Sequence, residues 1–310
     1  MVRSAILTGL IAVLIGWQQS VAAAPVGVVT ILEGDAVLIR GLSKFTPAEG
    51  MRIDANDLLE TGKKAFLRIE FTDGAIVDFG PSSRAQLNLP SLRYGERAPL
   101  YLLTGWLKLS AGKLAAGTKG SVASRSFDLI GVSGQAVERA ERGNGAVFAE
   151  DGAVRVVDRR HGGAMPVGLG SGDYLALRGT DAARVEREPP RDFVAALPRA
   201  FEDRLPSRLA LFRDREVTVK PSGTFRYDEV EPWIDAEAFI RRRFVHDWVE
   251  KADEEAFRDR LEAGLVRHPE WEPILHPERF ETPETPVAST PAPSSTAHSA
   301  PAPPPPKPEH

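Results

Sequence analysis

One segment constrains the fold more than any other, because its side chains alternate in character and the chain then turns back. Residues 65–71, Ala-Phe-Leu-Arg-Ile-Glu-Phe, alternate apolar and charged side chains, which is the period of an extended strand. Residues 72–74, Thr-Asp-Gly, supply the Asp-Gly pair that accepts the positive φ of a tight turn. Residues 75–79 then return as a second apolar run. The segment predicts a β-hairpin.

The same character extends over residues 26–180, where apolar runs are short and glycine punctuates nearly every gap. This pattern predicts a mainly β fold of short strands, arranged as a sandwich, a barrel or a short solenoid. No long amphipathic helix is expected before about residue 190. Beyond the hairpin, the strands are expected at Val26–Leu32, Ala36–Arg40, Ala85–Leu89, Leu100–Leu103, Trp106–Leu109, Phe127–Val132, Ala136–Arg139, Gly145–Ala149, Val154–Val157 and Tyr174–Leu177.

Residues 1–24 have the layout of a secretory signal peptide. One arginine precedes an apolar run of about 13 residues, and small side chains follow before Pro25. We expect cleavage after Ala22 or Ala23. The alternative is an uncleaved membrane anchor, but a spanning helix needs about 20 apolar residues. The mature chain is therefore expected to be periplasmic or secreted, with no stable membrane span after cleavage.

The composition changes at Glu188-Pro189-Pro190, and residues 188–281 are expected to form a helical C-terminal region. The strongest candidate helix is Ile234–Val249, whose apolar residues recur at helical spacing. Asp253 is expected to cap a further helix. Residues 282–310, rich in Pro, Ala, Ser and Thr, have almost nothing to bury and predict a disordered tail.

Residues 25–187 resemble the FecR domain family, with the core of the resemblance in residues 27–110. An opening strand and turn at 27–34 precede a glycine-to-threonine segment at 50–61, and the hairpin at 65–79 follows in the family's order. Residues 131–135, Gly-Val-Ser-Gly-Gln, keep only part of the later Gly-Val-Arg-Gly-Thr element. We expect the motif residues to hold the fold and bind nothing; they are Gly34, Gly50, Asp57, Thr61, Phe71, Asp73, Gly74 and Gly80.

The resemblance implies an envelope protein. Full-length FecR-type proteins transmit signals through a cytoplasmic segment that handles a sigma factor, followed by one membrane helix. Here only four residues precede the apolar run, so we do not carry the transducing role over. The expectation is a stand-alone exported FecR-type domain with extra C-terminal parts.

Composition excludes several kinds of chemistry. The chain has no cysteine, which removes disulfides, thiolate metal sites and thiol catalysis. A net charge of −4 does not favour nucleic acid as a partner. The histidines show no metal-ligand spacing, and Ser110-Ala-Gly-Lys113 lacks the motifs that would make it a serine nucleophile site. We therefore predict no catalytic residue, no cofactor and no metal.

Two histidines of the helical C-terminal region are not expected to be catalytic. His246 lies beside Asp247, but neighbours one residue apart on a helix do not face each other. His268 precedes Pro269, so it is expected to mark a bend.

These observations favour a non-enzymatic periplasmic or secreted protein with a binding or scaffold role in the cell envelope. Its partner would be an envelope protein or a polysaccharide. Two alternatives stay open: a signalling component that senses a ligand for a separate membrane partner, and an envelope hydrolase with its site in the C-terminal half. A pocket carrying two carboxylates or a histidine–carboxylate pair would favour the hydrolase.

Overall fold

A computed structural model of the 310-residue chain describes residues 27–71, 74–89, 98–111, 122–160, 165–215 and 217–280. The predicted signal peptide at 1–24, the predicted tail at 282–310 and motif residue Asp73 lie outside the described residues.

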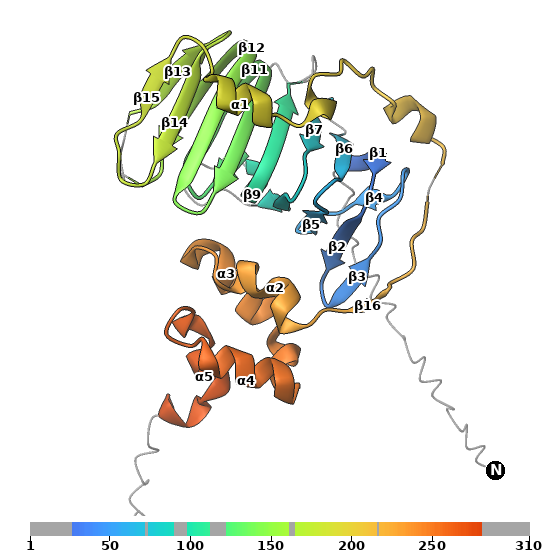
Figure 1. Cartoon of the computed structure of the whole chain (residues 1–310). Helices are drawn as coiled ribbons and strands as arrows, with labels where there is room; N and C mark the ends of the chain where they lie inside the picture. Colours follow the sequence, from blue (N-terminus) through green and yellow to red (C-terminus); the bar gives the residue numbers. More distant parts are fainter. Residues whose placement is uncertain are drawn as a thin grey trace, which may run out of the picture.

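The described chain is mainly β, as the sequence predicts (Figure 1). The predicted hairpin is present as β6 and β7, with Leu67 opposite Phe79. The strands are β1 Gly27–Glu33, β2 Ala36–Arg40, β3 Ser43–Phe45, β4 Arg52–Ile53, β5 Leu58–Thr61, β6 Phe66–Phe71, β7 Ile76–Phe79, β8 Arg84–Leu89, β9 Ala98–Ser110, β10 Val122–Ser124, β11 Phe127–Glu141, β12 Asn144–Asp158, β13 Val167–Gly170, β14 Tyr174–Arg178, β15 Arg184–Glu186 and β16 Gly223–Thr224.

Three of these strands are longer than predicted, because glycines bend them instead of ending them. β9, β11 and β12 each merge two strands that were expected to be separate. Gly105, Gly134 and Gly152 sit at the bends with φ of +100°, +92° and +73°, in the region that side chains with a Cβ rarely adopt. At Gly105 a Cβ would lie 2.3 Å from Ser83 Cα.

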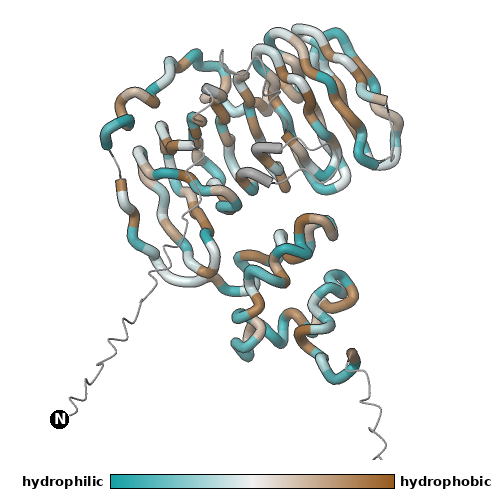
Figure 2. Tube along the Cα trace, turned by 180° about the vertical axis from the view of Figure 1, so that it is seen from behind, coloured by the Kyte–Doolittle hydropathy of each residue, from teal (hydrophilic) through white to brown (hydrophobic). Residues whose placement is uncertain are grey.

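The bends fold the sheet over on itself. Before Gly105, β9 pairs with β8 and β10; after it, β9 pairs with β7 and β11. One branch continues through β5 and β2, and the other through β6 and β1. Both branches contribute to one apolar cluster, for example Leu38 from the first and Leu67 from the second. Apolar and polar positions alternate along the strands in Figure 2, so each branch has an inner and an outer face.

The C-terminal region consists of short helices and 3₁₀ turns. The predicted helix Ile234–Val249 is wrong as one element: α2 ends at Ile234 and α3 begins at Ala238. The expected cap Asp253 is also wrong, since Glu254 precedes α4. The helices are α1 Arg191–Ala196, α2 Tyr227–Ile234, α3 Ala238–Asp247, α4 Glu255–Ala263 and α5 Glu272–Leu275, and the 3₁₀ turns are η1 Arg199–Phe201, η2 Leu209–Phe212, η3 Val249–Asp253, η4 Pro269–Trp271 and η5 Pro277–Arg279. In the described part of the chain no helix has the length and apolar character to cross a membrane.

This region covers both outer faces of the folded sheet. Trp233 and Trp248 from the helices α2 to α5 share a buried cluster with Tyr101 and Leu103 of β9. On the other face, Phe193 of α1 packs with Trp106 and Tyr174. The helices of the C-terminal region therefore cover the β-structure (Figure 1), and β16 adds a short strand to the sheet beside β3.

Residues 198–215, here called the strap, connect α1 to the helices and cross two of the motif glycines. At Gly80 a Cβ would lie 2.8 Å from Pro198 Cγ, and at Gly50 it would lie 3.0 Å from Phe212 Cδ1. Gly50 also has φ +91°, whereas φ at Gly80 is not positive. The glycine at position 80 is therefore required by the close approach of the strap and of Trp106.

We expect Gly80→Ala to lower the free energy of unfolding by about 1–3 kcal/mol, because the added methyl group must displace the strap or Trp106. Urea denaturation measures the change. The matched control is Gly168→Ala, because a Cβ at Gly168 meets no atom within 4 Å. Equal losses of stability in the two variants would contradict the requirement for glycine at position 80.

Candidate functional site

The predicted motif residue Asp57 is the buried partner in an ion pair with the partly exposed Arg40. Its carboxylate accepts hydrogen bonds from Arg40 Nε at 2.8 Å and Nη2 at 2.6 Å, and from the backbone N–H of Asp54 at 2.9 Å. Burial raises the pKa of Asp57, and the pairing with Arg40 offsets part of this effect. The hydrogen bond to Asp57 raises the pKa of Arg40. Asp57 thus closes the 54–57 turn against β2, with its side chain inaccessible to solvent.

The Asp57 pair forms one wall of a cleft of about 400 Å³, here called the seam cleft. The opposite wall is the C-terminal part of α3, which contributes Arg243, His246 and Asp247. The residues lining the seam cleft are Ile39, Arg40, Gly41, Ala55, Asn56, Asp57, Leu58, Arg243, Phe244, His246, Asp247 and Trp248.

Contacts between the two walls hold the seam cleft in shape. Trp248 Nε1 donates to Gly41 O at 3.2 Å, and Arg243 donates to Asn56 Oδ1. Arg243 also pairs with Asp247 at 2.6 Å. Asn56 has φ +76°, a conformation that asparagine tolerates better than most residues. Both arginines that line the cleft are therefore held in place by carboxylates.

The contribution of α3 to this site has no signature in the local sequence. Asn56 and Arg243 are separated by 187 residues, and no local pattern reports such a contact. The neighbours His246 and Asp247 do approach each other at the end of α3, with 3.4 Å between Nδ1 and Oδ1. The His246 side chain is nevertheless 93% exposed.

A second polar cluster lies on the outer face of β6 and β7, beneath the strap. Arg68 pairs with Asp78 through two hydrogen bonds of 2.6 and 2.8 Å, and Arg68 Nη1 donates to Leu205 O at 3.1 Å. Lys108 Nζ donates to Phe201 O at 2.5 Å. Glu70 accepts a hydrogen bond from the backbone N–H of Arg208 at 2.7 Å. These buried charges fasten the strap to the sheet.

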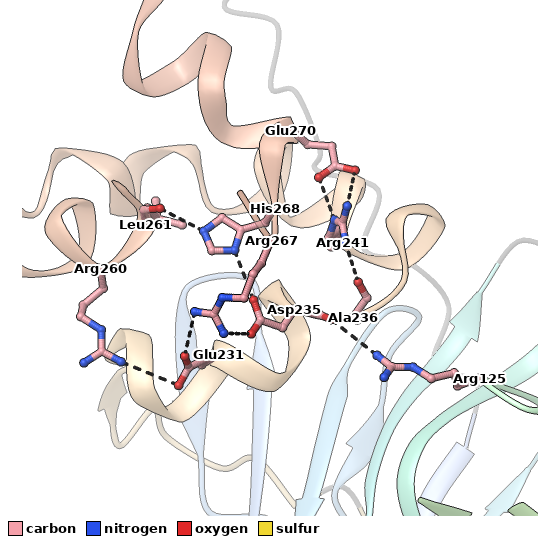
Figure 3. A network of polar contacts seen from close by, with 10 residues as sticks. All are labelled: Arg125, Glu231, Asp235, Ala236, Arg241, Arg260, Leu261, Arg267, His268 and Glu270. Atoms are coloured by element: carbon pink, nitrogen blue, oxygen red, sulfur yellow. Dashed lines mark hydrogen bonds and ion pairs between the residues drawn. The ribbon is translucent and has the colours of Figure 1, made fainter. Parts of the chain in front are cut away.

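The helical region contains a histidine–carboxylate pair in which the histidine is buried (Figure 3). His268 Nδ1 lies 3.2 Å from Asp235 Oδ1, and Nε2 lies 3.0 Å from Leu261 O. Arg267 also pairs with Asp235 and reaches Glu231 at 3.3 Å. The His268 side chain is 0% exposed. Because Asp235 follows α2 and His268 follows α4, the pair connects the ends of these two helices. His268 also lies at the predicted bend before η4.

The remaining motif residues take positions in turns and in the core. Gly34 and Gly74 have φ of +75° and +86°. Thr61 Oγ1 donates to Gly80 O at 2.7 Å, which joins the end of β5 to the β7–β8 turn. Phe71 belongs to the inner apolar cluster. Their predicted role, to hold the fold and bind nothing, stays a prediction. Within the described ranges no cluster of three or more His, Asp or Glu side chains could hold a metal ion.

Comparison with known proteins gives a limited result. No protein-family model matches the chain, and no curated protein matches it. Two solved structures of a candidate anti-sigma factor from Parabacteroides distasonis ATCC 8503 are similar to it, each with a TM-score of 0.37. Their sequences are 14% and 15% identical to this chain over 44% of its length, and the match spans 62% and 63% of those chains. A likeness at this level carries no argument, so the FecR resemblance stays a hypothesis.

Proposed function

We propose that this chain is an exported, non-enzymatic binding protein of the cell envelope, which holds a protein partner in the seam cleft. The observation that carries the proposal is the construction of this cleft. Its two walls come from the β-structure and from α3, and direct hydrogen bonds join them. A cleft that is already shaped before binding loses less conformational entropy when a partner docks.

The chemistry of the seam cleft favours recognition over catalysis. Arg40 and Arg243 are each neutralised by a carboxylate at hydrogen-bonding distance. A general base needs a tuned, partly desolvated environment, whereas His246 is almost fully exposed. In the pair of His268 and Asp235, the histidine cannot touch a substrate, because it has no exposed surface. These features count against the hydrolase alternative.

The lining of the seam cleft suggests the kind of partner. Charged groups of both signs and the amide of Asn56 line the cleft together with apolar side chains, and its volume is about 400 Å³. A protein loop that carries both an acidic and a basic side chain would match these groups, because each wall of the cleft presents a pair of opposite charges. We therefore propose a loop of an envelope protein as the occupant.

Site-specific photo-cross-linking tests this proposal. A photoreactive amino acid replaces His246 in the full chain, which is expressed in its native envelope and irradiated. We expect one discrete protein adduct, weakened several-fold when Arg243→Ala removes the contact between the walls. Mass spectrometry of the same material should find a mature N-terminus at Ala23 or Ala24.

The matched control places the photoreactive residue at Val266, which is 97% exposed elsewhere on the helical region. It should give no such adduct. Either the same adducts from both positions or none from position 246 would contradict the seam cleft as the contact site.

A further inference from the structure

A second hollow lies on the outer face of the other branch of the sheet, beside α1, and is separate from the seam cleft. Its volume is about 230 Å³. We call it the trough; its lining residues are Arg139, Glu141, Asn144, Gly145, Ala146, Tyr174, Ala176, Leu177, Arg178, Asp192 and Phe193.

Strand register creates the floor of the trough. Arg139 of β11 stands opposite Ala146 of β12, and Ala146 stands opposite Ala176 of β14. Two alanines therefore lie side by side where larger side chains would fill the face. Phe193 of α1 packs at one side against the ring of Tyr174, with 4.9 Å between the ring centroids. The result is a shallow apolar floor with an aromatic wall.

The opposite side of the trough is polar. Asn144 stands opposite Arg178 in the register. Arg139 forms an ion pair with Glu141, and its Cζ lies 4.9 Å from the ring centroid of Trp106. Asparagine and arginine are hydrogen-bond donors, and the carboxylate is an acceptor. The trough thus presents both kinds of group over a small apolar floor.

The formal charges in the trough balance. Arg139 and Arg178 oppose Glu141 and Asp192. A site built for an anion would present an excess of cationic donors. A site whose fixed charges balance suits a neutral ligand that can both donate and accept hydrogen bonds.

The Tyr174 side chain adds an unused polar group. Among the described residues its hydroxyl makes no hydrogen bond, and the nearby charges that act on it include Arg178 and Asp192 from the trough. Burial raises the pKa of Tyr174, so the phenol keeps its proton and can donate. The hydroxyl is not among the buried side-chain atoms that lack a partner, so it is open to solvent and can reach a polar ligand in the trough.

We propose that the trough binds one uncharged sugar ring. Sugar hydroxyls both donate and accept hydrogen bonds, and the C–H face of a ring can rest on Ala146 and Ala176. The volume of about 230 Å³ lies below the range of about 300–1,000 Å³ typical of larger ligands. A single ring of a glycan therefore fits the trough better than an extended compound.

Ligand-observed NMR on the full chain tests the proposal. The probes are the methyl glycosides of glucose, galactose, mannose and N-acetylglucosamine, with glucuronate and galacturonate as the charged comparison. We expect at least one neutral glycoside to bind with a Kd on the order of 1 mM. Tyr174→Phe, which removes only the hydroxyl, should weaken binding about fivefold.

Two further variants test the location. Ala176→Leu fills the floor and should abolish binding, whereas Ala182→Leu at an exposed site should leave it unchanged. If Ala176→Leu fails to fold by circular dichroism, Tyr174→Phe decides alone. The proposal is overturned if no neutral glycoside binds, if only the charged sugars bind, or if Tyr174→Phe binds as tightly as the wild type.

Discussion

Glu138→Gln is expected to make this protein more stable at neutral and alkaline pH. Glu138 lies on β11 between Ala136 and Ala140, whose side chains belong to the inner apolar cluster. Its side chain is 0% exposed, and neither carboxyl oxygen has a hydrogen-bond partner among the described residues. Burial raises the pKa of Glu138 to about 8. The nearby Ser124 hydroxyl contacts the backbone of residues 126 and 127 and not the carboxylate of Glu138.

The direction of this pH dependence follows from the different pKa of Glu138 in the folded and unfolded chain. The folded chain keeps the Glu138 proton up to about pH 8, whereas the unfolded chain loses it near the ordinary value of 4.5. The contribution of Glu138 to the free energy of unfolding has its full value below pH 4.5, and it is lost as the pH rises to 8. The loss approaches about 1.4 kcal/mol per pH unit, which gives about 3 kcal/mol by pH 7 and about 5 kcal/mol above pH 8.

Glutamine has the same shape and no charge at any pH, so the variant should lack this slope. Urea denaturation at pH 4.5, 7 and 9 measures the difference, which should be within about 1 kcal/mol at pH 4.5 and several kcal/mol at pH 9. Glu186→Gln, on the exposed strand β15, is the control and should keep the wild-type slope. If the stability of the wild type and of Glu138→Gln changed with pH in the same way, the raised pKa of Glu138 would be refuted.

Arg68→Ala is expected to be the most damaging single change on the outer face, with a loss of about 3–5 kcal/mol. The side chains of Arg68 and Asp78 are 5% and 3% exposed, so removing the arginine leaves a carboxylate buried without its partner. It also removes the donor to Leu205 O, which helps to hold the strap. Burial already raises the pKa of Asp78, so the variant should lose more stability as the pH rises.

Two comparisons separate the buried charge from general damage. Arg68→Met/Asp78→Leu removes both charges and should cost less than Arg68→Ala, because no lone charge stays buried. Arg187→Ala breaks a pair with Asp173 whose arginine is 90% exposed, and it should cost less than about 1 kcal/mol. A loss below 1 kcal/mol for Arg68→Ala, measured by urea denaturation, would show that the pair does not fasten the strap.

For the candidate sites, the sequence located only one part. It singled out Asp57 within the 50–61 segment, but the partner residues on α3 follow more than 180 positions later. It also treated residues 136–139 and 145–149 as short strands, without showing that their outer faces would bring Ala146 beside Ala176. Register between strands depends on the path of the whole chain, and no local period encodes it.

The sequence by itself determined the local elements: the hairpin of β6 and β7, the glycine turns, and the change from strands to helices after residue 188. These follow from side-chain period and backbone freedom, which act between near neighbours. Charged residues that alternate with apolar ones in a strand usually form the solvent-exposed face of the sheet. Only the tertiary structure decided that Arg68 and Glu70 would be buried. The reason is that the strap, more than 130 residues later in the chain, offers backbone N–H and C=O groups to those charges.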